Sequence, residues 1–245
     1  MDSGYYAACT ALISRTQELD TIANNLANAS TAGFRAEQDV FSEVLANAGS
    51  PSGSALDQAM NSYGILSGTT LDQNQGALQK TGNDLDVAIE GPGYFEVQTT
   101  DGQVYTRDGS FQISAHGQLV NSQGDAVMGA SGAISMPPGP VSISADGTIS
   151  SKGAVVGKLK VVEFPAGTQL TSMGNLYYSA PANTAATATQ SSVRQGMLES
   201  SNVNPITAMV QLVNAQRSAE MMQRALSMFN SEIDKTATQD LPKVG

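Results

Sequence analysis

Apolar residues recur at helical spacing in two stretches, one near each end of the chain. In residues 3–29 they return every seven positions, which is typical of a helix with one apolar seam. A second stretch covers residues 205–233, where Asn204 is placed to cap the helix and Pro205 suits its first turn. The pattern therefore predicts two amphipathic helices that bracket the chain.

The two predicted seams are built mainly from Leu, Met and Ala. In the first helix the seam residues are Tyr5, Leu12, Leu19 and Leu26. A second line is formed by Ala8, Ile22 and Ala29, which follow Tyr5, Leu19 and Leu26 by three residues. In the second helix the seam residues are Met209, Leu212, Gln216, Ala219, Met222, Leu226, Phe229 and Ile233. The spacing in the second seam alternates between three and four except after Ala219, where a repeated three predicts a stammer. Such narrow stripes give an isolated helix little stability, so we expect the two helices to pack as a coiled coil.

Short alternating runs and turn signals fill the region between the helices. Asp-Gly or Gly-Asp pairs at positions 101, 108, 124 and 146 are typical of hairpin turns. The predicted strands are residues 94–99, 103–107, 111–114, 141–144 and 158–164. Because no ten-residue helical pattern separates these strands, the sequence favours an antiparallel all-β domain over a parallel sheet.

The sequence predicts an α+β fold with a discontinuous helical domain. Residues 1–36 and 198–245 are expected to form the terminal helical domain, and residues 79–197 the central antiparallel all-β domain. Residues 37–78 are interpreted as a linker or an extended hairpin. The Gly-, Ser- and Asn-rich composition of residues 47–70 is compatible with both interpretations.

Composition and charge exclude several classes of function. The net charge of −10 would repel a phosphate backbone, so nucleic acid is not an expected partner. Only 14% of the residues are charged, against about 25% in ordinary soluble domains. Cys9 is the only cysteine, so no internal disulfide is possible. The sequence shows no cleavable signal peptide and no transmembrane segment, which by itself points to the cytoplasm.

The sequence offers no arrangement of residues that is typical of catalysis. His116 is the only histidine, which leaves a catalytic triad or a paired-histidine zinc site without a partner. The segment at 91–93 lacks the Lys and the helix start of a phosphate-binding loop, and Asp84 and Asp86 lack the other ligands of a calcium loop. We therefore predict no catalytic, cofactor-binding or metal-binding residues, no cofactor, no small-molecule substrate and no enzyme activity.

Three sequence blocks carry a resemblance to a known family. Residues 23–34 read ANNLANASTAGF, residues 85–95 read LDVAIEGPGYF and continue to YTRDGSF at 105–111, and residues 199–205 read ESSNVNP. These blocks closely resemble the signature sequences of the flagellar axial proteins, the family of basal-body rod and hook subunits. The resemblance covers nearly the whole chain and weakens at residues 47–70 and 180–192. In length the chain is most like a proximal rod subunit, which is the favoured interpretation, while residues 81–111 resemble the distal rod subunit at least as well.

This resemblance implies a structural subunit of the flagellar basal-body rod that polymerises into the axial drive shaft and export tube. It also implies export through the flagellum's own type III channel without a cleavable signal peptide and assembly in the periplasm, which replaces the cytoplasmic expectation. The implied partners are other rod subunits, copies of the chain itself and the flagellar export apparatus.

The implied assembly interface combines the helix seams with the asparagines of the motifs. Its residues are Leu12, Leu19, Ile22, Asn24, Asn25, Leu26, Asn28, Asn202, Asn204, Met209, Leu212, Gln216, Met222, Leu226 and Phe229. The alternative interpretation is a secreted β-rich binding or adhesin-like module that oligomerises through its terminal helices. An enzyme acting on the cell wall is a third and more remote alternative.

Overall fold

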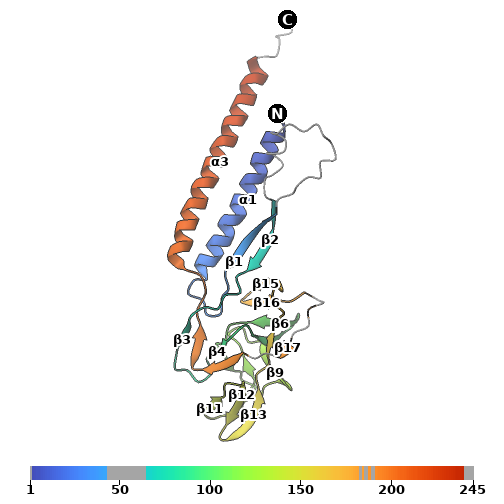
Figure 1. Cartoon of the computed structure of the whole chain (residues 1–245), viewed down its shortest axis with the longest axis vertical. Helices are drawn as coiled ribbons and strands as arrows, with labels where there is room; N and C mark the ends of the chain where they lie inside the picture. The colour runs from blue at the N-terminus through green and yellow to red at the C-terminus, as the bar shows by residue number, and fades with distance from the viewer. Residues whose placement is uncertain (1, 43–64, 182–183, 185–186, 189–190, 240–245) are drawn as a thin grey trace. The chain divides into compact units, whose positions relative to one another are not determined.

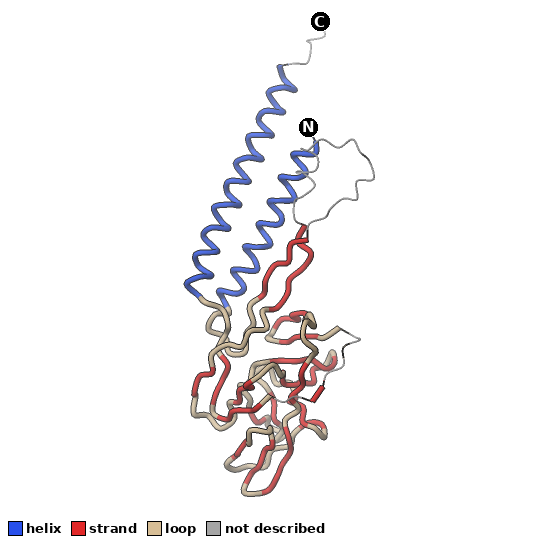
Figure 2. The backbone as a smooth tube through the Cα atoms, in the orientation of Figure 1, coloured by secondary structure: helices blue, strands red, loops and turns tan. Residues whose placement is uncertain are grey.

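The structure is a computed structural model that describes residues 2–42, 65–181, 184, 187–188 and 191–239. In this part of the chain two helices flank a long series of short strands, as Figure 1 shows along the colour gradient and Figure 2 by element type. The helices are α1 (Asp2–Ala27) and α3 (Pro205–Gln239). The strand pairs whose registers are defined all run antiparallel, so the predicted α+β class with an antiparallel β region is confirmed.

The strands are short because a turn interrupts the chain every few residues. They are β1 (Glu37–Ser42), β2 (Ile65–Leu71), β3 (Leu78–Lys80), β4 (Val87–Glu90), β5 (Tyr94–Thr99), β6 (Gly102–Thr106), β7 (Gln112–Ile113), β8 (Leu119–Val120), β9 (Ala126–Gly129), β10 (Gly132–Ala133), β11 (Val141–Ile143), β12 (Thr148–Ser151), β13 (Ala154–Lys158), β14 (Val161–Glu163), β15 (Thr171–Gly174), β16 (Tyr177–Ser179), β17 (Thr187–Ala188), β18 (Ser192–Gln195) and β19 (Met197–Glu199).

The chain divides into two compact units. One, here called the helical unit, contains Met1–Leu26, Gln38–Thr69 and Asn204–Gly245. The other, the β unit, contains Ala27–Glu37 and Thr70–Val203. The segments directly after α1 and directly before α3 thus belong to the β unit, whereas the sequence assigned them to the terminal helical domain.

The β unit is built around a sheet in the order β15-β16-β6-β5-β9-β8-β7. Its main core contains Phe95 and Phe111, whose rings meet edge to face at 5.0 Å, together with aliphatic residues of the neighbouring strands. A smaller aromatic cluster on another part of the unit includes Tyr94 and Tyr178, with ring centroids 5.9 Å apart. The first four residues of β5 are all buried, and alternate residues point to opposite faces of the sheet, so Phe95 enters the main core and Tyr94 the aromatic cluster.

Strands from the end of the chain complete the β unit. Strand β18 pairs with β4 through Ser192↔Glu90 to Gln195↔Val87, and β19 pairs with β3 through Met197↔Lys80 to Glu199↔Leu78. The residues immediately before α3 are therefore needed to complete the strand pairing of the β unit. The same pairing places Glu199, the last residue of β19, inside the unit.

Most predicted strands are confirmed, with one informative difference. The predicted strand at 94–99 coincides with β5, but the one predicted at 158–164 is divided between β13 and β14. The division occurs because the backbone changes partners: the N–H of Leu159 donates to the Gly147 carbonyl, and that of Lys160 to the Met128 carbonyl. Sequence alternation continues through such a change and therefore does not reveal it.

In the helical unit, β1 and β2 pair as a two-stranded sheet. The Thr21 hydroxyl of α1 donates to the Asp39 carboxylate of β1 at 2.9 Å, which ties the first helix to this sheet. Most of the segment 47–70, interpreted as a linker or hairpin, lies outside the described residues. The predicted cap of the second helix is confirmed, because the Asn204 side-chain oxygen accepts from the N–H groups of Ile206 and Thr207 at 3.0 and 3.2 Å.

The environment of Tyr177 leads us to expect that the stability of the β unit decreases at alkaline pH. The Tyr177 hydroxyl donates to the Asp125 carboxylate, and burial together with this bond raises the pKa of Tyr177 to about 12. Because the unfolded tyrosine loses its proton near pH 10, the folded state holds more protons between pH 10 and 12. Stability is therefore expected to be complete below pH 10 and to fall as the pH rises toward 12.

Replacing Tyr177 by Phe should remove part of this alkaline decline while lowering stability at pH 7 by about 1 kcal/mol through the lost hydrogen bonds. Thermal melting followed by near-ultraviolet circular dichroism from pH 8 to 11.5 measures both effects. Tyr105 and Tyr178, whose pKa values burial also raises, should preserve a residual slope. An unchanged pH profile in Tyr177→Phe would contradict this account.

Candidate functional site

The first helix buries a broad stripe that contains the predicted seam. Leu12, Leu19, Ile22 and Leu26 are all half-buried, whereas Ile13 on the other side of the helix is 60% exposed. Ser14 is the most deeply buried described residue of α1. The side chains of residues 2–8 and of Thr10 lie outside the described part, so the predicted seam residues Tyr5 and Ala8 are not compared with this stripe.

In the first half of the second helix, the buried line is displaced by one position from the predicted seam, because Ala208 and Ala215 are buried in place of Met209 and Gln216. Its members are Ala208, Leu212, Ala215, Ala219, Met222 and Leu226, all buried or half-buried. Met209 is 55% exposed and Gln216 is exposed. With Ala208 and Ala215 in their places the spacing alternates regularly between four and three, so the buried line contains no stammer.

Within this chain the buried line of α3 thus does not include Met209 and Gln216. Their part in contacts with other subunits stays a prediction, as does that of the other predicted interface residues. The side chain of Phe229 lies outside the described residues.

The second helix also carries apolar residues on its opposite side. Ile206, Val210, Val213, Met221 and Met228 are all exposed, and they follow a line roughly half a helical turn away from the buried one. We call these five residues, together with the exposed Arg217 between them, the outer face of α3. A helix that is apolar on two opposite sides is typical of a helix packed between two partners.

The asparagines of the sequence motifs serve several different parts of the structure. Asn24 is exposed, Asn25 and Asn28 are half-buried, and Asn28 accepts a hydrogen bond from the Thr31 hydroxyl at 3.2 Å. The Asn202 side chain accepts from the N–H of Ala36 at 2.7 Å and donates to the carbonyls of Asp72 and Asn74 at 3.0 Å each. Asn202 therefore joins three segments of its own β unit.

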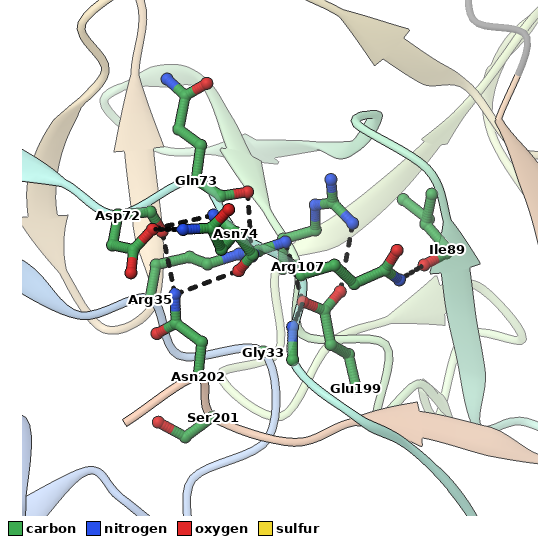
Figure 3. Close-up of polar contacts among 12 residues, drawn as sticks. Gly33, Arg35, Asp72, Gln73, Asn74, Ile89, Arg107, Glu199, Ser201 and Asn202 are labelled. Atoms are coloured by element: carbon green, nitrogen blue, oxygen red, sulfur yellow. Dashed lines mark hydrogen bonds and ion pairs between the residues drawn. The ribbon is translucent and has the colours of Figure 1, made fainter. Parts of the chain in front are cut away.

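Beside Asn202 lies a buried ionic cluster of Arg35, Glu199 and Arg107 (Figure 3). Arg35 follows α1, Arg107 follows β6, and Glu199 ends β19. The Glu199 carboxylate is 2.8 Å from Arg35 Nη2 and accepts from Arg107 Nη1 at 3.1 Å, and each of the three side chains is only 1% exposed. We call these three residues the Arg-Glu-Arg cluster.

Backbone groups complete the coordination of the Arg-Glu-Arg cluster. The N–H of Gly76 donates to the Glu199 carboxylate at 3.0 Å, Arg35 donates to the Gln73 carbonyl, and Arg107 donates to the Gly91 carbonyl at 2.7 Å. The Arg107 guanidinium also lies over the Tyr94 ring, 4.7 Å from its centroid. Two buried cations thus share one buried anion.

The excess of positive charge affects the pKa of Arg107. Burial and the neighbouring Arg35 lower the pKa of Arg107, while Glu199 and Tyr94 act in the opposite direction. Among the described residues, Arg35 Nε, Arg35 Nη2 and Arg107 Nε have no aligned hydrogen-bond acceptor. The carboxylate of Glu199 is therefore the group on which the burial of both guanidinium ions depends.

Gly33 allows the segment after α1 to approach the cluster closely. Its N–H donates to the Glu199 carbonyl at 2.8 Å, and its φ of 72° lies in the left-handed region. A Cβ atom at this position would lie 2.4 Å from the backbone nitrogen of Asp108. Gly33 lies six residues beyond the end of α1 and permits a backbone contact in the β unit.

The cluster was not predicted from the sequence, although all three charged residues lie within or beside the quoted motifs. The available signal was the position of Glu199 in a strand of otherwise apolar residues in a chain with few charges. In the part of the chain that the structure describes, no group of His, Cys, Asp and Glu is arranged to hold a metal ion. Neither of the two described helices has an apolar stretch that could cross a membrane.

Models of known protein families match three parts of this chain. Residues 6–35 match a family described as flagella basal body rod protein. Residues 88–155 match the flagellar hook protein FlgE/F/G D1 domain, and residues 194–239 match the flagellar basal body rod FlgEFG protein C-terminal family. The three matches thus include α1, the first part of the β unit, Arg35, Arg107 and Glu199.

Individual relatives match over nearly their whole length. The chain is 34% identical to the flagellar basal-body rod protein FlgF of Caulobacter vibrioides, with 100% of both chains covered. It is 35% identical to FlgF of Escherichia coli over 93% of this chain and 94% of the relative. It is 32% identical to the flagellar basal-body rod protein FlgG of a Buchnera aphidicola strain over 92% and 95%. The chain therefore belongs to the family of flagellar basal-body rod proteins.

Proposed function

We propose that this rod subunit polymerises through α1 and α3 into the shaft and export tube of the flagellum, while its β unit holds the two connecting segments together. The single observation that carries the proposal is the outer face of α3, which is apolar and exposed although the opposite side of the same helix is already buried. Burying side chains of this size contributes roughly 1.5–3 kcal/mol each, which makes the outer face a strong site for a neighbouring subunit.

The burial of α1 and α3 is consistent with the predicted coiled-coil arrangement, in which both helices pack within one subunit and beside those of neighbours. The seam residues Leu12, Leu19, Leu212 and Leu226 remain partly exposed in the single chain. Association with neighbouring helices would remove this remaining apolar surface from water.

We further infer a structural role without catalysis, a position in the proximal part of the rod, and assembly in the periplasm after export without a cleaved signal peptide. Close similarity to proteins named FlgF supports the first two inferences. The export apparatus is then a necessary partner. The family matches give the adhesin-like alternative no support.

Deletion of the gene tests the proposal. We expect the deletion strain to lose swimming motility and to lack complete basal bodies by electron microscopy, because a missing rod section leaves later subunits without a base. A plasmid copy should restore both properties. Normal basal bodies in the deletion strain would show that the chain is not a required rod subunit.

A further inference from the structure

Two exposed helix surfaces in this chain are complementary to each other. The outer face of α3 consists of large apolar residues with Arg217 at its centre. The exposed side of α1 carries Ile13, Thr16, Asp20 and Ala23 at alternating spacings of three and four. We call these four residues the outer face of α1, and it is mostly small or apolar with one carboxylate at Asp20.

The charges at the centres of the two faces are available for a partner. Asp20 and Arg217 are exposed, and neither forms an ion pair among the described residues. The other helix charges whose side chains the structure describes are paired, since Arg15 pairs with Glu18 at 2.5 Å and Arg224 lies 3.7 Å from Glu220. Thr16 donates its hydroxyl to the Leu12 carbonyl of its own helix, which leaves its methyl group for apolar contact.

From these observations we propose that the outer face of α3 packs on the outer face of α1 of a second copy of this chain, with Arg217 of one copy paired with Asp20 of the next. The inference rests on the proposed function. Within one chain the two faces lie on the sides opposite the buried lines of their helices, so they are not directed at each other. A second copy supplies the missing surface, and such a head-to-tail contact between unlike faces builds a helical filament.

The spacing of the residues defines the register of this contact. Within the helical unit α1 and α3 run in opposite directions (Figure 1), so copies that point the same way along a filament bring α1 of one against α3 of the next in opposite directions. In this antiparallel register, with Asp20 opposite Arg217, Thr16 lies opposite Met221, and Ala23 lies opposite Asn214, one residue from Val213 of the outer face. Small residues of α1 thus meet large residues of α3, which allows close packing of the helices.

Cysteine cross-linking between separately tagged copies tests the occupant and the register. In a Cys9→Ala background, one copy carries Thr16→Cys and the other Met221→Cys, and purified basal bodies are oxidised. We expect a mixed dimer of the two tagged copies. The matched control pairs Thr16→Cys with Val213→Cys, which meet only in a parallel register and should give no dimer.

A charge reversal tests the ion pair. Asp20→Arg and Arg217→Asp should each lower incorporation of the chain into basal bodies by roughly tenfold, because each places like charges opposite each other. The double variant Asp20→Arg/Arg217→Asp should restore incorporation. Restoration by the double variant is a result that a general loss of helix stability in either single variant would not produce.

The results separate this inference from the proposed function. Assembled basal bodies that give no mixed dimer, or that give a cross-link to a different rod protein, overturn the assignment of a second copy. The reference variant Leu19→Asp places a charge in the half-buried stripe of α1 and is expected to block incorporation. If Leu19→Asp blocks incorporation but the double charge variant does not restore it, the ion pair alone is overturned. If Leu19→Asp and both charge variants are incorporated normally, the helices are not the polymerising elements and the proposed function itself is wrong.

Discussion

Replacement of Glu199 by Ala is expected to destabilise the β unit by about 3–5 kcal/mol, enough to unfold a marginally stable domain. The change leaves Arg35 and Arg107 buried at 1% side-chain exposure with no anion between them. It also removes the acceptor of the Gly76 N–H. Because Glu199 ends the last strand of the unit, the loss should release β19 and the segment that leads to α3.

Urea unfolding of the full chain, followed by tyrosine circular dichroism, measures this effect. The matched control is Glu90→Ala, which removes a carboxylate from an exposed pair with Arg194 and should leave the unfolding midpoint almost unchanged. A triple replacement of Arg35 by Met, Arg107 by Leu and Glu199 by Leu should fold, because it removes the buried charges together. A Glu199→Ala protein as stable as the wild type would show that the cluster does not hold the β unit together.

Leu19→Asp is expected to abolish incorporation into basal bodies while leaving the β unit folded. Leu19 is half-buried in the stripe of α1. A carboxylate placed there must either stay hydrated, which prevents packing, or be buried at a free-energy cost of several kcal/mol. Since Leu19 belongs to the helical unit, we expect the unfolding of the β unit to be unaffected. Immunoblotting of purified basal bodies measures incorporation.

Gln17→Asp provides the matched control for this variant. Gln17 is exposed, lies two residues from Leu19 and belongs to neither the buried stripe nor the outer face of α1. The same added charge should therefore be tolerated there. Equal incorporation of Leu19→Asp and the wild type would contradict the assignment of the α1 stripe to assembly.

Sequence periodicity located the helices well but not the face that α3 buries. A seam search favours large residues, so it selected Met209 and Gln216 in line with Leu212, whereas the structure buries Ala208 and Ala215. Adjacent positions on a helix differ by about 100°, and alanine contributes little to a hydrophobic pattern. Which of two neighbouring lines is buried depends on the surface that covers it.

Local sequence patterns were sufficient to predict the two terminal helices, the cap at Asn204, the antiparallel character of the middle region and the family resemblance. These features depend on local spacing, turn residues and short blocks of sequence, which a linear pattern contains in full. Arg35, Arg107 and Glu199 lie far apart in the chain and come into contact only in the folded protein. Their meeting depends on the closure of the β unit by β18 and β19, because a long-range ionic contact has no local signal in the sequence.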